Sequence, residues 1–145
     1  MAWLAYLEQY PAGDKALKAA DYLNLTRNYS FRNHTLGRDA VTLEKIRFVP
    51  FGSELADSSY QSLLLVGEVF TSMKKGTLQV IVYQKNNKEL ARQRAIAIKK
   101  FLLAENPSVS SKKIGISWFS EPQQTTIRGK KLSIDESVSF FVTAK

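Results

Sequence analysis

The chain of 145 residues contains no cysteine and only one histidine, His34. The absence of cysteine excludes disulfides, thiol catalysis and cysteine-ligated zinc. One histidine cannot build a multi-histidine metal site, and His34 is expected on the surface because Arg32, Asn33 and Thr35 around it are polar. The sequence therefore predicts no metal and no other cofactor.

Patterns that carry catalysis are also missing. The chain has no glycine-rich phosphate loop, no nucleophile elbow and no H-E-x-x-H motif. Its carboxylates are scattered, and Asp135-Glu136 is the only adjacent pair. Adjacent residues on a strand point to opposite faces of a sheet, so this pair does not converge on a substrate. The expectation is a protein that is not an enzyme.

No apolar run is long enough to cross a membrane. Met1–Pro11 is apolar and aromatic, but it is too short for a span and lacks the basic start of a signal peptide. Its Trp3, Tyr6 and Tyr10 fit either the interfacial end of an upstream membrane helix or the packing face of a short helix. The polar, aperiodic stretch 24–39 resembles a linker. Residues 1–40 are therefore expected to be a membrane-proximal extension, followed by one domain at 41–145.

The composition is that of a folded, basic protein. Hydrophobic residues make up 44% of the chain and the net charge is +8. Nearly all of the excess charge lies in residues 41–145, which carry sixteen basic and nine acidic side chains. A basic domain prefers anionic partners such as nucleic acid, a membrane surface or a cell-wall polymer. A charge that only maintains solubility is the alternative.

Hydrophobic periodicity after residue 40 predicts the element order β-α-β-α-β-β. The expected strands are 41–48, 78–84, 113–119 and 133–143, the expected helices are near 58–75 and 87–104, and 121–131 is an expected polar loop. One apolar sheet face covered by both helices gives an α+β two-layer sandwich with a mixed four-stranded sheet. Its last two strands are expected to be antiparallel.

The second expected helix contains a basic residue in an unusual position. Arg94 falls inside the apolar stripe, between Leu90 and Ile98, whereas a solvated charge belongs off the stripe. Either its stem covers apolar surface while the guanidinium reaches solvent, or its guanidinium forks onto the carboxylate of a ligand. Asn86 or Asn87 is expected to cap the start of this helix.

The same helix carries a family resemblance. The pattern Asn87-x-x-Leu90-Ala91-x-x-Arg94-Ala95-x-x-Ile98-x-x-Phe101-Leu102 resembles the peptidoglycan-binding helix of OmpA-like C-terminal domains. That family includes the flagellar stator protein MotB and the lipoprotein Pal. Two further runs, 46–55 and 114–122, resemble the family's first strand with its following turn and its third strand with its exit. The resemblance covers about residues 41–145.

The resemblance implies a non-catalytic periplasmic domain that binds peptidoglycan. Arg94 and Asn87 are the implied binding residues, with Arg94 on a carboxylate of diaminopimelate in the stem peptide. It also implies an inner-membrane channel partner reached through a transmembrane segment before residue 1, and a homodimer, but no nucleic acid. Among such domains the chain is most similar to the MotB-like accessory proteins of type I secretion systems.

The chain departs from this family at two ligand contacts. The turn after the second strand lacks the family's aspartate, because 82–87 contains no acid, and the family's arginine is missing at the start of the last strand, 135–138. Two alternatives therefore stay open: a protein-interaction domain whose ligand site has decayed, and a basic α+β domain that binds nucleic acid.

Overall fold

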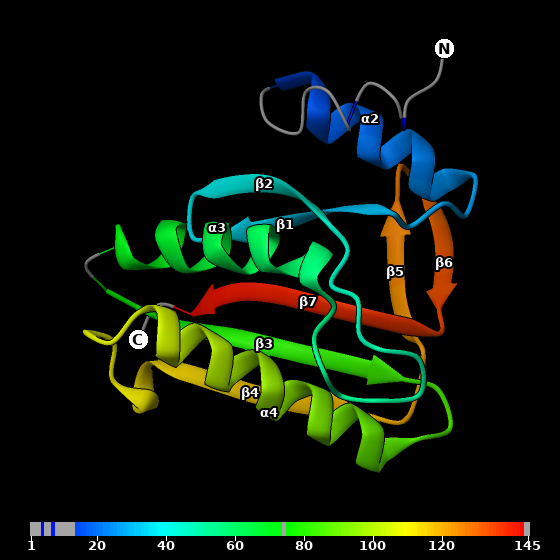
Figure 1. The fold of residues 1–145 in the computed structure, drawn as a ribbon. Helices are drawn as coiled ribbons and strands as arrows, with labels where there is room; N and C mark the ends of the chain where they lie inside the picture. Colours follow the sequence, from blue (N-terminus) through cyan, green and yellow to red (C-terminus); the bar gives the residue numbers. More distant parts are fainter. Residues whose placement is uncertain (1–3, 5–6, 8–13, 74, 144–145) are drawn as a thin grey trace.

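The computed structural model describes Leu4, Leu7, residues 14–73 and residues 75–143. Its helices are α2 (Asp14–Leu25), α3 (Tyr60–Thr71) and α4 (Lys88–Glu105), with 3-10 turns at Asp57–Ser59 and Ser111–Lys113. Its strands are β1 (Phe31–Leu36), β2 (Asp39–Glu44), β3 (Thr77–Gln84), β4 (Ile114–Phe119), β5 (Gln123–Ile127), β6 (Lys130–Ile134) and β7 (Glu136–Thr143), as Figure 1 shows.

A mixed five-stranded sheet in the order β2-β1-β7-β3-β4 forms the centre of the fold. The β1–β2 and β3–β7 pairs are antiparallel, and the β1–β7 and β3–β4 pairs are parallel. The predicted count of four strands is wrong, because β1 lies within the stretch that looked like a linker. The last two predicted strands, β4 and β7, run in opposite directions as expected, but they are not neighbours, since β7 lies between β1 and β3.

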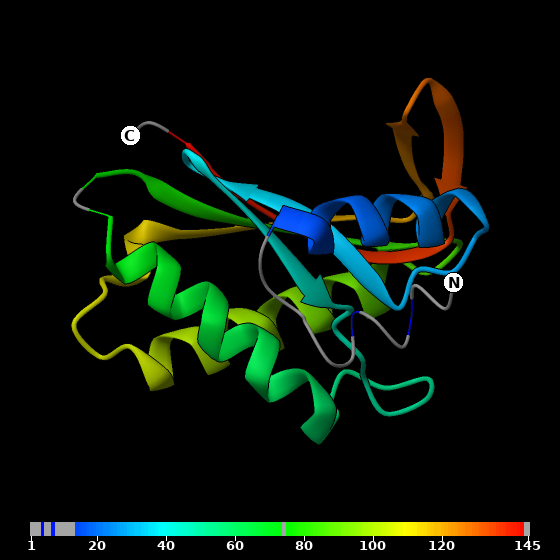
Figure 2. The same ribbon diagram turned by 90° about the horizontal axis from the view of Figure 1, so that it is seen from above.

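Helices α3 and α4 both cover one face of this sheet, as the view in Figure 2 shows. Alternate residues of β3, namely Leu78, Val80 and Val82, point toward these helices and are buried. They pack with Leu63 of α3 and Ile98 of α4 in the main hydrophobic core. The predicted α+β class, with two helices on one sheet face, is confirmed.

The opposite face of β1 is covered by α2. Phe31 packs into a second buried cluster with Ala16 and Ala20. The Asn33 side-chain amide donates to the carbonyl of Leu17 at 2.8 Å and to Asp21 Oδ1 at 3.1 Å. The chain before Val41 thus contributes a strand and a helix to the folded unit, and the sheet starts before the expected boundary. The interpretations of Trp3, Tyr6 and Tyr10 lie outside the described residues.

The stretch 121–131 was expected as a polar loop, and this is wrong. It contains β5, the turn of the β5–β6 hairpin and the first residues of β6. Its two-residue turn has positive φ at both Arg128 (49°) and Gly129 (83°), which suits the twist of a tight hairpin. The hairpin is tied to β7 by the Gln123 amide, which donates to Ser139 Oγ at 3.0 Å and accepts from Ser137 Oγ. In Figure 2 it projects on the side of the sheet opposite to α3 and α4.

Candidate anion-binding pocket

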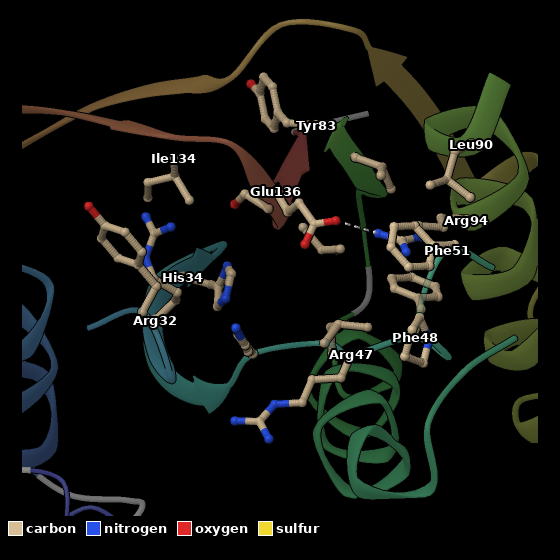
Figure 3. Close-up of a pocket in the computed structure, with 17 residues that line it drawn as sticks. Arg32, His34, Arg47, Phe48, Phe51, Tyr83, Leu90, Arg94, Ile134 and Glu136 are labelled. Atoms are coloured by element: carbon tan, nitrogen blue, oxygen red, sulfur yellow. Dashed lines mark hydrogen bonds and ion pairs between the residues drawn. The ribbon is translucent and has the colours of Figure 1, made fainter. Parts of the chain in front are cut away.

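A cavity of about 620 Å³ lies between β1, the chain after β2, the first turns of α4 and the start of β7. This volume is in the range of pockets that take small ligands. Residues from all four segments surround it in Figure 3. The lining residues are Tyr29, Arg32, His34, Lys45, Ile46, Arg47, Phe48, Pro50, Phe51, Val82, Tyr83, Leu90, Arg94, Ile134, Glu136, Ser137 and Val138.

Arg94 reaches this pocket with its guanidinium already held. Its Nε donates to the carbonyl of Gly52 at 2.9 Å, and its Nη1 donates to Gln84 Oε1 at 2.9 Å and to Glu136 Oε1 at 3.3 Å. Its Cζ lies 4.6 Å from the centre of the Phe48 ring. The residue is only 7% exposed, so the interpretation that it reaches solvent from the edge of the stripe is wrong. Its binding of a ligand carboxylate stays a prediction.

The family resemblance implied that Asn87 and Arg94 bind the ligand together, but Asn87 does not lie beside Arg94 in the pocket. Its Oδ1 accepts a hydrogen bond from the backbone N–H of Leu90 at 3.0 Å, which is the predicted N-cap of α4. Asn87 does not line the pocket. The fold therefore brings Arg94 to the cavity, while the Asn87 side chain caps the start of α4 outside the cavity.

His34 is buried, in contrast to its predicted place on the surface. Alternation along β1 puts Arg32, His34 and Leu36 on the face that α3 and α4 cover. The His34 ring meets the Phe140 ring edge to face at 5.4 Å, and its Nδ1 accepts the backbone N–H of Phe140 at 3.4 Å. This burial was hard to predict from the sequence, because only Phe31 and Leu36 of β1 are strongly apolar.

Cations dominate the pocket wall. Arg32, Lys45, Arg47 and Arg94 line it, against the single carboxylate of Glu136, which already pairs with Arg94. Like charges held around one cavity create a positive potential that attracts anions. Burial lowers the pKa of Arg32, opposed by the attraction of Tyr29 and Asp21. The arrangement can bind an anion, and sequence reasoning missed all of these residues except Arg94.

An aromatic side chain stands at the same site. Phe51 is 96% exposed although it lines the pocket, and its φ of 61° is in the left-handed region. That conformation costs a residue with a Cβ about 1–2 kcal/mol. The loop therefore presents an apolar surface to solvent next to the cations of the pocket.

Burial lowers the pKa of His34 to about 3, and the nearby charge of Arg32 adds to this effect. The folded protein thus keeps a neutral imidazole, while the unfolded chain takes up a proton as the pH falls below 6.5. We expect stability to be lost on acidification from pH 6.5 toward 3, by about 2 kcal/mol at pH 5. Urea unfolding of the wild type and of His34→Gln, each at pH 7 and at pH 5, measures this loss of stability.

The two proteins share every other titratable side chain, so the comparison isolates the histidine. A His34→Gln variant with the same loss between pH 7 and 5 as the wild type would contradict this prediction. The C2 proton of His34 gives an independent readout, since its chemical shift should stay constant over that range.

The residues that the structure describes include no group of three or more side chains suited to holding a metal ion. Within the same part of the chain, no helix is long and apolar enough to cross a membrane. A scan against family models finds no match to this chain, and a search of curated proteins finds no significant one.

Proposed function

We propose that this chain is a non-catalytic domain that binds an anionic cell-wall polymer, peptidoglycan, through a carboxylate of the stem peptide. One observation carries the proposal: among the described residues, four basic side chains line a ligand-sized pocket whose only carboxylate is already paired. The overall charge of +8 adds a long-range attraction to an anionic polymer.

Arg94 is the residue that would meet the stem carboxylate. Among the described residues no hydrogen-bond partner is found for its Nη2, while Nε and Nη1 are bound. Glu136, whose side chain is 62% exposed, contacts Nη1 at the longest of these distances, 3.3 Å. A ligand carboxylate can replace that exposed carboxylate on Arg94 without leaving a buried charge unpaired.

The wider role in this proposal follows the family that the sequence resembles. Such a domain would anchor an inner-membrane, stator-like or secretion-associated complex to the wall from the periplasm. The order β2-α3-β3-α4-β4 agrees with the order that hydrophobic periodicity predicts after residue 40. The added β1 and the β5–β6 hairpin are features that the resemblance does not explain.

Co-sedimentation with purified sacculi tests the proposal. The double variant Lys45→Gln/Arg47→Gln removes two exposed cations from the pocket wall, and we expect it to bind about tenfold more weakly at low salt. Glu136→Gln removes the competing carboxylate and should bind more tightly. Binding of the wild type should weaken as salt rises, because exposed charges are screened.

The matched control is Arg92→Gln/Lys100→Gln, which removes the same residue types from exposed positions on α4 outside the pocket. An equal loss of binding in both double variants would mean that only net charge matters, and that the pocket does not recognise the polymer. Wild-type protein that stays in the supernatant at low salt would refute wall binding.

A second candidate is a domain that binds a protein partner, and the open face of the sheet favours it. Tyr83 and Phe119 stack there with ring centres 5.5 Å apart, and Phe141, opposite Gln79 on the same face, is 38% exposed. Exposed aromatic side chains are enriched in protein interfaces. In that case sacculus binding would be absent, and Phe141→Ser would change partner binding without changing the pocket.

A further inference from the structure

Arg32 is a cation in the pocket that forms no ion pair with the described residues, although the charge of Asp21 attracts it from beyond contact distance. Its Nε is buried and has no hydrogen-bond partner among the described residues. It forms no ion pair with them either, since the only carboxylate on the pocket wall, Glu136, is bound to Arg94. Its one aromatic contact is with Tyr29, whose ring centre lies 6.0 Å from Cζ. A buried guanidinium N–H without a partner is rare, because burial removes its water.

His34 supplies a second donor beside it. The two side chains are two residues apart on β1 and thus on the same face of the strand. Nδ1 of His34 accepts from the Phe140 N–H, so the proton of the neutral imidazole is on Nε2. No described residue accepts a hydrogen bond from this Nε2–H. Lys45, whose backbone N–H donates to the carbonyl of Ser30 just before β1 at 2.8 Å, adds a third donor group to the pocket wall.

This group is separate from the site assigned to Arg94. In Figure 3, Arg32 and His34 project from β1 on one side of the cavity, while Arg94, Phe48 and Phe51 lie on the opposite side. Apolar side chains of Ile46, Val82, Ile134 and Val138 contribute to the wall of the same cavity. The cavity of about 620 Å³ is much larger than one carboxylate group needs.

We propose that Arg32 and His34, assisted by Lys45, form a second oxyanion subsite, which takes a carboxylate or phosphate group. With Arg94 at the other end, the pocket suits an elongated ligand that has an anionic group at each end and an aliphatic middle. The subsite goes beyond cell-wall binding and does not rest on it, because it is inferred from the unpaired donors of Arg32 and His34; only the two-ended ligand also uses the Arg94 site of the proposed function. An oxyanion would satisfy the Arg32 guanidinium with a charge-assisted hydrogen bond.

The test is a nuclear magnetic resonance titration of the full chain labelled with nitrogen-15. Because His34 is the only histidine, its imidazole nitrogens give an unambiguous signal. The probes are acetate, pimelate (a seven-carbon dicarboxylate) and inorganic phosphate, each added at constant ionic strength. We expect saturable shifts of His34 Nε2 and Arg32 Nε, with pimelate binding more tightly than acetate. Phosphate binding more tightly than either would assign the subsite to a phosphate group.

Arg32→Gln should weaken the binding of every probe that saturates by about tenfold or more. Arg32→Lys keeps the charge but loses the planar donor group, so its binding should be intermediate. Arg92→Gln is the matched control, because it removes an exposed arginine outside the pocket and should bind like the wild type. Amide spectra of each variant establish that it is folded before it is titrated.

Shifts that do not saturate, or equal affinities for wild type and Arg32→Gln, would overturn the subsite. Equal affinities for acetate and pimelate would overturn the two-ended ligand. Neither result depends on sacculi, so failure of this inference is distinguishable from failure of wall binding.

Discussion

A chain that begins at Val41 should not fold to the native sheet. The truncation removes β1, which separates β2 from β7, and leaves β2 without its antiparallel partner. It also removes Leu36, which is fully buried in the main core. Loss of one such side chain costs about 2–5 kcal/mol, and the whole domain is stable by only about 5–15 kcal/mol. Circular dichroism during urea unfolding should show no cooperative transition.

Two substitutions in β1 test how much the packing of its side chains contributes to stability, apart from the presence of the strand. Leu36→Ala should lower the free energy of unfolding by about 3 kcal/mol, because a cavity forms between the sheet and its helices. Thr35→Ala changes an exposed side chain and should alter stability by less than about 0.5 kcal/mol. A chain starting at Val41 that unfolds at the urea concentration of the wild type would show instead that residues 1–40 are dispensable.

Replacement of Arg94 by alanine should destabilise the protein by about 3 kcal/mol, apart from any effect on a ligand. The buried guanidinium joins the loop at Gly52 to Gln84 of β3, and its removal leaves these acceptors unpaired. It also removes the contact of Cζ with the Phe48 ring. Arg94→Lys retains a charge but cannot reach both acceptors with the same planar geometry, so it should lose less stability.

The control for this measurement is Arg92→Ala on the same helix. Arg92 is exposed and pairs only with Glu89, one turn away, so its loss should cost less than about 1 kcal/mol. Urea unfolding gives the free energies, and sacculus binding is then compared at a temperature where every variant is folded. An Arg94→Ala protein as stable as the wild type would show that the contacts with Gly52 and Gln84 are not structural supports.

The two helices on the core face and strands β3 and β4 could be predicted from the sequence. Leu78, Val80 and Val82 are apolar at every second position of β3, and the apolar stripe of α4 repeats at helical spacing. The local periodicity therefore predicted which of these side chains are buried. The N-cap was likewise predicted as Asn86 or Asn87, and the structure gives Asn87, because an N-cap depends on the side chain and the three residues after it. Arg94 was noticeable for the same reason, as a charge inside an apolar stripe.

Strand β1 and the β5–β6 hairpin could not be predicted from local periodicity. The polar residues of β1 are stabilised by partners far along the chain: Asn33 by Leu17 and Asp21, and His34 by Phe140. The hairpin strands contain few large apolar residues, and Gln123 is held by serines of β7. Hydrogen bonds between distant segments leave no period in the sequence, so these strands resembled a linker and a loop.

The α+β class, the helix that carries Arg94 and the excess of positive charge all follow from local patterns in the sequence. The place where that charge gathers depends on how the strands pair. Pairing of β1 with β2 and β7 places Arg32 and His34 on the wall of the cavity that Arg94 reaches from α4. The site depends on this because Arg94 lies more than forty residues from Arg32, Lys45 and Arg47 in the sequence, and strand pairing brings these segments together.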